Sequence, residues 1–329
     1  MLKTKSILPP VALFFMCVLG LALNAGCSAA GDVWPKKAIT LVVTFAAGGG
    51  SDVAGRVMAK HLARELGVPV NVENKPGGNQ IPGIQAVLDA APDGYTLLLE
   101  QPANSSIECT MKDVPFKIEE RTYGPLMVTG PNTYAVSAKS PYKTLKDLLE
   151  AGWKDPGSIT WAYTGYNVTS FSHVQLFRAG GIDPSKTKPV EFSGGGPANT
   201  AVAGGHVVLA GGGPGGVLPL YKSGDLRILA VTGDKRAAVL PDVPTGKEQG
   251  YDLNIINWFG ISGPKNLPKN VLERLDVAAK KITSSPEYAR DLENEGSVPL
   301  YMSPSDTRDF VLKEFETMKK LAADLGIAK

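Results

Sequence analysis

Residues 39–52, with the sequence ITLVVTFAAGGGSD, constrain the fold of this chain more than any other segment. They are typical of a short apolar strand, a glycine-rich turn and the first turn of a helix, with Ser51 and Asp52 near the helix start. Glycines let a backbone approach a ligand closely. The first N–H groups of a helix have no acceptor within the helix, and with the helix dipole they form a site for an anion. The segment therefore predicts an anion-binding loop at the end of a strand.

A second, looser version of this pattern follows at residues 159–170. Residues 159–162 predict a strand, residues 163–169 a loop, and a predicted helix starts at about Ser170. Two helix N-termini that can each bind an anion suggest two lobes that hold a small acid between them.

Apolar strand-like runs alternate with helical patterns through the rest of the chain. Predicted strands lie at 39–44, 70–73, 95–99, 134–137, 159–162, 190–192, 207–209 and 228–231, and predicted helices at 53–66, 81–90, 145–150, 170–179 and 217–222. From Pro264 the pattern is nearly all helical, with helices at 269–283, 285–295 and 304–325. The alternation predicts an α/β architecture in which each of two lobes is a mainly parallel sheet flanked by helices.

The order of these elements predicts a discontinuous division of the chain. Residues 33–130 plus 258–329 form the first lobe and residues 131–257 the second. The hinge then lies where the chain crosses between them, near residues 130–132 and 254–257.

The N-terminus has the features of an export signal. Lys3 and Lys5 precede an apolar run over residues 11–23, which is shorter than the roughly twenty residues of a membrane-spanning helix. The run ends in LNAGC, and the small residues before Cys27 resemble a bacterial lipobox. We predict a signal peptide over residues 1–26, lipidation of Cys27, and an extracytoplasmic location in the periplasm or on the outer face of the cell membrane. The alternative is ordinary cleavage a few residues later and a freely soluble product.

Charge and cysteine content argue against several classes of protein. The chain has 34 Lys and Arg against 32 Asp and Glu, and Lys3 and Lys5 supply the whole excess. The chain beyond the signal is therefore neutral, which argues against binding to nucleic acid or a membrane surface. Only Cys109 lies beyond Cys27, so no disulfide scaffold is predicted and Cys109 is expected to be a small buried hydrophobe.

Several blocks of sequence carry a family resemblance. They are WPKKAI at 34–39, FAAGGGSD at 45–52, VENKPGG at 72–78, APDGYTLL at 91–98, GDLRILAVT at 224–232, LPDVPT at 240–245 and WFGI at 258–261. Together they resemble the tripartite tricarboxylate transporter solute receptors, the TctC or Bug family of extracytoplasmic binding proteins. The resemblance implies a two-lobed periplasmic-binding-protein-like (Venus flytrap) fold. It also implies that the lobes close on a small carboxylate and deliver it to a membrane permease. We predict a monomer without a cofactor.

The loop chemistry and the resemblance together predict the ligand-binding residues. They are Phe45, Ala47, Gly48, Gly49, Gly50, Ser51 and Asp52 in the first loop, Thr164, Gly165, Tyr166, Asn167, Thr169, Ser170 and His173 in the second, and Gly195, Gly196, Pro197 and Ala198 in a third. The alternative for each loop is a plain turn without a ligand. Asp52 is expected to cap its helix or to meet a ligand hydroxyl or amine, because two carboxylates at close range repel each other.

Two departures from the family pattern fall in the second lobe. The loop at 164–173 is longer than usual, and residues 211–216 are glycines and a proline where relatives often carry an aspartate. Both departures are compatible with the two anion-binding loops, but they leave the contacts to the far end of the ligand undetermined.

No catalytic, metal or nucleotide site is predicted. The glycine runs lack the Gly-Lys-Ser/Thr ending of a phosphate loop, and no Gly-x-Ser-x-Gly elbow occurs. The three histidines, His61, His173 and His206, are far apart in sequence. We therefore expect a binding protein and not an enzyme. An exported hydrolase that acts between the lobes, and a ligand-sensing partner of a membrane receptor, are the alternatives.

Overall fold

The computed structural model describes residues 34–324, apart from residues 112, 166 and 295. The predicted signal peptide and Cys27 lie outside the described residues. Contacts divide the chain into residues 1–34 and a compact unit from Pro35 onward, which contains all the elements below. Within the described part of the chain, we find no helix that combines the length and the hydropathy needed to cross a membrane.

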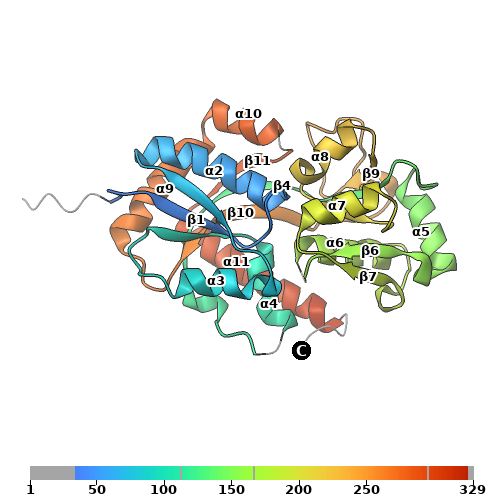
Figure 1. The fold of residues 1–329 in the computed structure, drawn as a ribbon, viewed down its shortest axis with the longest axis horizontal. Coiled ribbons are helices and arrows are strands. Elements are labelled where there is room, and N and C mark those ends of the chain that lie inside the picture. Colours follow the sequence, from blue (N-terminus) through green and yellow to red (C-terminus); the bar gives the residue numbers. More distant parts are fainter. Residues whose placement is uncertain (1–33, 112, 166, 295, 325–329) are drawn as a thin grey trace, which may run out of the picture. The chain divides into compact units, whose positions relative to one another are not determined.

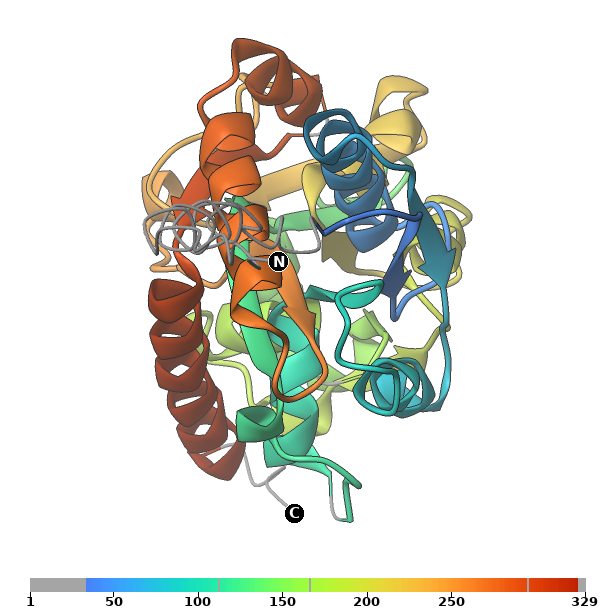
Figure 2. The same cartoon turned by 90° about the vertical axis from the view of Figure 1, so that its left-hand side faces the viewer.

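A six-stranded sheet forms the centre of the first lobe (Figure 1). Its order is β11-β4-β10-β3-β1-β2. The strands are β1 (Ile39–Val43), β2 (Val70–Asn74), β3 (Thr96–Glu100), β4 (Thr122–Pro131), β10 (Ile256–Gly263) and β11 (Val298–Met302). The helices of this lobe are α2 (Gly50–Leu66), α3 (Ile81–Leu88), α4 (Pro102–Thr110), α9 (Lys269–Thr283), α10 (Pro286–Asn294) and α11 (Pro304–Asp324). Figure 2 shows α11 as the long red helix, which packs against β4 and α4.

The buried face of α2 packs against β1 and β2. Met58 and Leu62 are fully buried, and the helix ends at Gly67, whose φ of 75° favours glycine. A Cβ on Gly55 would lie 3.2 Å from a methyl group of Val43, so helix and strand are in close contact. This packing sets the first turn of α2 directly beyond the carboxyl end of β1.

The second lobe contains two smaller sheets. β5 (Thr133–Ser137) pairs antiparallel with β8 (Ala210–Gly212) and β9 (Leu226–Val231), and β6 (Thr160–Tyr163) pairs parallel with β7 (Lys188–Glu191). Trp161 bridges to Leu209 beside β8. The helices are α5 (Leu145–Lys154), α6 (Val168–Ala179), α7 (Gly195–Ala203) and α8 (Pro214–Lys222), which Figure 1 shows around these strands. Two clusters of buried apolar side chains hold the lobe together.

The chain passes between the lobes at two adjacent places. β4 ends at Pro131, and β5 starts two residues later, while β10 begins at Ile256 opposite Pro131. The Asn257 side chain donates to Asn132 Oδ1 over 2.6 Å and to the carbonyl of Pro131 over 3.3 Å. This side chain therefore ties the two crossing segments to each other.

The two-lobed α/β class predicted from the sequence is confirmed, but the sheets are mixed and not mainly parallel. β1 is parallel to β2 and β3, whereas β10 is antiparallel to β3 and β4, and β11 is antiparallel to β4. The cause is the pair of crossings. β4 leaves the first lobe where β10 returns to it, so the two strands run in opposite directions.

Candidate functional site

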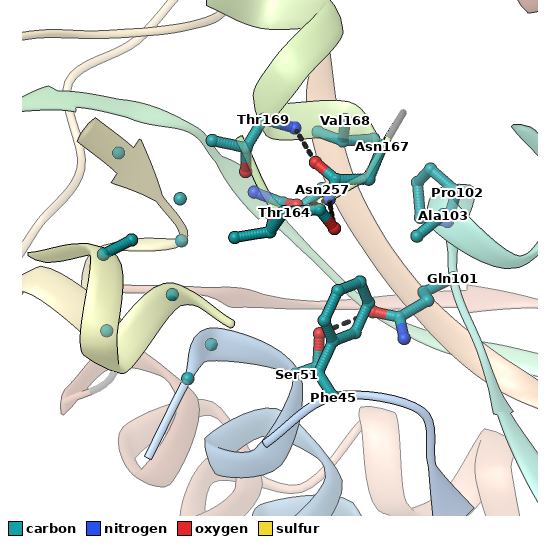
Figure 3. A pocket seen from close by; sticks show the side chains of 18 of the residues that line it. Phe45, Ser51, Gln101, Pro102, Ala103, Thr164, Asn167, Val168, Thr169 and Asn257 are labelled. Carbon is teal, nitrogen blue, oxygen red and sulfur yellow. Dashed lines mark hydrogen bonds between the residues drawn. The ribbon is translucent and has the colours of Figure 1, made fainter. Parts of the chain in front are cut away.

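A pocket lies between the two lobes, with about 740 Å³ of space including the part open to solvent. Figure 3 shows Phe45, Ser51 and Gln101 on one side of the pocket, with Thr164, Asn167 and Thr169 opposite them. The other lining residues are Gly49, Gly50, Pro102, Ala103, Ala162, Val168, Gly195, Ala198, Asn199, Gly211, Gly212, Gly213, Gly216, Asn257 and Phe259.

The loop between β1 and α2 is held in shape by Asp52. The Gly48 N–H donates to Asp52 Oδ2 over 3.0 Å, Asn74 donates to Oδ1 over 3.0 Å, and Arg56 pairs with both oxygens. Burial opposes the charge on Asp52, but these donors outweigh it and hold the pKa of the carboxyl below its usual value. Asn74 also donates to the carbonyl of Phe45 over 3.0 Å. Asp52 therefore braces the loop from behind, while Gly49, Gly50 and Ser51 face the pocket.

Two helices from opposite lobes start at the pocket with no side-chain cap. α2 begins after Gly49 and α7 after Gly194, and neither glycine can satisfy the first N–H groups of its helix. Gly50 and Ser51 of α2 and Gly195 of α7 line the pocket. Each helix start carries about half a positive charge from the helix dipole. The pocket therefore presents opposed backbone donors to a negatively charged group.

The start of α6 differs from what the sequence predicts. Thr164, Asn167 and Thr169 do line the pocket, but Asn167 Oδ1 accepts hydrogen bonds from the N–H groups of Thr169 (3.0 Å) and Ser170 (3.2 Å). An N-cap of this kind satisfies the donors that an anion would otherwise take. An uncapped helix start of the second lobe that offers an N–H at its first position is at Gly195 on α7, and the expectation for the amides of Thr169 and Ser170 is corrected.

Two further helices begin at the pocket wall. α4 starts after Gln101 and α8 after Gly213, again without side-chain caps, although Pro102 and Pro214 at their first positions supply no N–H. Their dipoles still add to the positive potential of the pocket. Among the described lining residues none carries a charged side chain. The positive potential at this lining therefore comes from backbone dipoles and neutral side-chain donors, and not from charged side chains.

Glycines bring the two lobes into close contact beside the pocket. A Cβ on Gly50 would lie 3.6 Å from the backbone of Gly213, and one on Gly216 would lie 3.3 Å from the Gly50 nitrogen. A Cβ on Gly194 would lie 3.3 Å from that of Ala46. Alanines at Gly194 and Gly216 would need a small shift of the facing segment, and one at Gly50 would be in ordinary contact with Gly213. The glycine runs therefore let the starts of α2, α7 and α8 surround one small space.

The predicted site residues divide into two groups. Those that line the pocket are Phe45, Gly49, Gly50, Ser51, Thr164, Asn167, Thr169, Gly195 and Ala198. Those that the structure places outside the lining are Ala47, Gly48, Asp52, Gly165, Ser170, His173, Gly196 and Pro197. Tyr166 lies outside the described residues. Gly48 and Ala47 lie next to Gly196 at the contact between the lobes, and Ser170 donates to the carbonyl of Gly165 over 2.7 Å.

His173 is a core residue, which corrects the expectation of a ligand contact. Its ring is fully buried, with centroids 5.6 Å from Trp161 and 6.1 Å from Tyr134. Neither ring nitrogen meets the geometry of a hydrogen bond within the described residues. Burial lowers the pKa of His173 to about 4, and the nearby backbone of Ala210 only partly opposes this shift. The imidazole is therefore neutral at physiological pH.

This buried histidine predicts a loss of stability in acid. The unfolded chain takes up its proton near pH 6.5, whereas the folded protein does so only near pH 4. The unfolded state binds more protons between these values, so the free energy of unfolding should fall by up to about 3 kcal/mol as the pH drops. His173→Phe keeps a ring in this place and removes the titration. Urea unfolding of both proteins at about pH 7.5 and about pH 4.5 should show the variant gaining stability relative to wild type in acid.

The comparison with the variant matters because a second buried group titrates in the opposite sense. Glu314 accepts the Trp258 indole N–H over 2.8 Å, and burial raises the pKa of its carboxyl to about 7. The difference between wild type and variant cancels this contribution. Equal differences at the two pH values would contradict a neutral, buried His173.

Sequence reasoning missed several lining residues. Gln101, Pro102 and Ala103 form the start of α4, and Asn257 and Phe259 come from β10. The proline after the strand at 96–100 is a helix-start signal that points to α4. The glycines at 211–213, which depart from the family pattern, also line the pocket.

One cluster of titratable groups lies elsewhere. His61, Glu287 and Asp291 place ligand atoms within 4.8 Å of one another. Their carboxylates already pair with cations, Asp291 with Lys60 and Glu287 with Arg64, each over 2.6 Å. The cluster is therefore an ion-pair network that joins α2 to α10.

Comparison with known proteins agrees with the resemblance noted in the sequence. Residues 54–327 match the model of the family described as "Tripartite tricarboxylate transporter family receptor" (TctC). A UPF0065 protein in the gbd 5′ region of Cupriavidus necator is 31% identical over 94% of both chains. Protein BugT of Bordetella pertussis is 28% identical over 94% of this chain and 97% of its own. The solved structure of the periplasmic binding protein BugD is 27% identical, covers 90% of this chain and 100% of its own, and has a TM-score of 0.83. This chain belongs to the TctC family of tripartite tricarboxylate transporter receptors.

Proposed function

We propose that the protein is an extracytoplasmic receptor that captures a small carboxylate between its lobes. In this proposal the lobes close on the carboxylate, and the closed form delivers it to the permease of a tripartite tricarboxylate-type transporter. The observation that carries the proposal is the opposition of two uncapped helix starts, at Gly50–Ser51 and at Gly195, in a pocket whose described lining has no charged side chain. Neutral N–H donors hold an anion without the desolvation cost of burying an ion pair.

The same geometry supports binding over hydrolysis. Ser51 is the hydroxyl at the start of α2, and its Oγ donates to Gln101 Oε1 over 2.5 Å. An activated serine needs a base within hydrogen-bond reach. No histidine, lysine or carboxylate is found among the described lining residues. BugD, a related structure, is described as a periplasmic binding protein.

The export signal and the division into lobes are part of the proposed function. We keep residues 1–26 as the signal peptide and Cys27 as the lipid attachment site, with the mature protein a monomer. We also keep 33–130 plus 258–329 as the first lobe and 131–257 as the second. The crossings near Asn132 and Asn257 then form the hinge for closure.

A ligand panel tests this function. Thermal unfolding of the receptor is followed with dicarboxylates, tricarboxylates, acidic amino acids and aromatic acids, each beside the neutral amide of the same skeleton. A ligand at one hundred times its dissociation constant should stabilise the protein by about 2.7 kcal/mol. We expect at least one acid to raise the unfolding temperature and its amide to leave it unchanged. No shift with any acid at high concentration would overturn the proposal.

A further inference from the structure

The loop between β2 and α3 has an unusual backbone. Gly77, Gly78, Asn79 and Gln80 all have positive φ, at 96°, 53°, 49° and 66°. Glycine adopts this region freely, and asparagine tolerates it, but it is unfavourable for glutamine. Strain of this kind persists only where the surrounding structure holds it, and it gathers at functional segments. The position of the Gln80 side chain shows what the strain achieves.

Gln80 belongs to the first lobe but contacts the second. Its side chain is buried, with 5% of the residue exposed, and Nε2 donates to the carbonyl of Thr164 over 3.5 Å. A Cβ on Gly165 would lie 3.3 Å from both Asn79 Oδ1 and Gln80 Nε2. Gly165 has a φ of 91°, so glycine fits both its backbone and the small space beside Gln80. The left-handed run thus carries an amide across to the segment that leads into α6.

The carbonyl that Gln80 contacts is part of the pocket wall. Thr164 lines the pocket, and its carbonyl also accepts Asn167 Nδ2 over 3.1 Å. Asn167 is the cap of α6, and Ser170 in the first turn donates to the carbonyl of Gly165 over 2.7 Å. Gln80 itself is not among the lining residues. It therefore reaches the pocket only through Thr164 and the capped start of α6.

We infer that Gln80 is a positioning residue, which holds residues 164–165 and 167–170 of the second lobe against the first lobe when the pocket is closed. The inference rests on the proposed function, because it assumes that the pocket opens and closes. A latch of this kind acts in the closed form only. Loss of its amide should therefore let the residues around Thr164 open more often from the closed form.

The test compares Gln80→Ala with Gln85→Ala. Gln85 lies on α3 and donates to Asp89 over 2.7 Å within its own lobe, so it is a matched control without a contact across the pocket. Hydrogen–deuterium exchange is measured for the full chain with and without 10 mM succinate as the probe. We expect Gln80→Ala to speed exchange at residues 164–170 by roughly two- to tenfold, the range of one net hydrogen bond, and Gln85→Ala to leave it unchanged.

Two more measurements separate a latch from a general effect on folding. Without ligand, Gln80→Ala should unfold at the same temperature as Gln85→Ala. Gln80→Glu, which keeps the size of the side chain but cannot donate to the Thr164 carbonyl when ionised, should behave like Gln80→Ala. If both Gln80 variants exchange at the wild-type rate at residues 164–170, with and without succinate, the inference is overturned. That result would leave the proposed function standing, because the ligand panel on the wild-type receptor decides it separately.

Discussion

Replacing Ser51 with aspartate should weaken the binding of carboxylates by at least about a hundredfold, equivalent to about 2.7 kcal/mol. Ser51 is in the first turn of α2 and lines the pocket, so the new carboxylate would occupy the position proposed for the ligand's own. Two like charges about 4 Å apart repel each other by roughly 4 kcal/mol near a protein surface. Calorimetric titration with the acid that gives the largest shift in the panel measures the loss.

The stability of the ligand-free variant distinguishes a loss of binding from a loss of folding. An acidic residue in the first turn of a helix is favourable to the helix dipole, so Ser51→Asp should not lower the unfolding temperature. Ser51→Ala is the matched control, because it removes the hydrogen bond to Gln101 without adding charge. It should cost about tenfold or less in affinity. Wild-type affinity of Ser51→Asp for the same acid would show that the anion does not bind at the start of α2.

The loop at 45–52 could be predicted from the sequence because its signals are local. An apolar strand, a glycine turn and an amphipathic helix lie next to one another, and the structure has β1 and α2 in these places. The role of Asp52 was less accessible. Asp52 accepts hydrogen bonds from Arg56 on the same helix and from Asn74, which the fold brings there from the next strand. Only the three-dimensional contact shows that the carboxylate faces away from the pocket.

The start of α6 shows where local reasoning ends. An asparagine before a helix can bind a ligand or cap the helix, and both interpretations fit the same residues. The structure decides for capping at Asn167, which satisfies Thr169 and Ser170. The loop before α7 has glycine in the same place and so leaves its donors without a side-chain cap. The position of the anion site that we propose for the second lobe therefore depends on which loop lacks a capping side chain.

The strands β4 and β10 were not predicted because their pairing is long-range. They pair with each other across more than a hundred residues, and both contain glycines that weaken a strand pattern.

The helix α4 was not predicted because its buried face is polar. Asn104 is fully buried, donates to the Leu99 carbonyl and accepts from Thr44, and its own carbonyl accepts from Arg121. Hydrophobic periodicity cannot detect a helix that is held by buried hydrogen bonds.

The second large effect concerns the glycines at 211–213. Gly211→Ala should lower the free energy of unfolding by about 3 kcal/mol or more, at the upper end of overpacking effects. A Cβ on Gly211 would overlap the carbonyl oxygen of Thr133 and would lie 3.3 Å from His173 Nε2. Gly211 pairs with Tyr134 on β5, so the obstacle is the backbone of a central strand. Backbone atoms cannot move aside as the end of a flexible side chain can.

Gly195→Ala is the matched control for this prediction, because Gly195 also lines the pocket but a Cβ there meets nothing within 4 Å. Its unfolding free energy should stay within about 0.5 kcal/mol of wild type, as measured by urea titration of both variants. Equal stability of the two variants would contradict the packing of β8 on β5. Gly213→Ala is a second control in the same titration, since its Cβ would be 3.9 Å from Asn257 Nδ2 and clashes with no backbone. Gly211 is thus required by the sheet, whereas an alanine at Gly213 meets no backbone obstacle and would only take up space in the proposed ligand pocket.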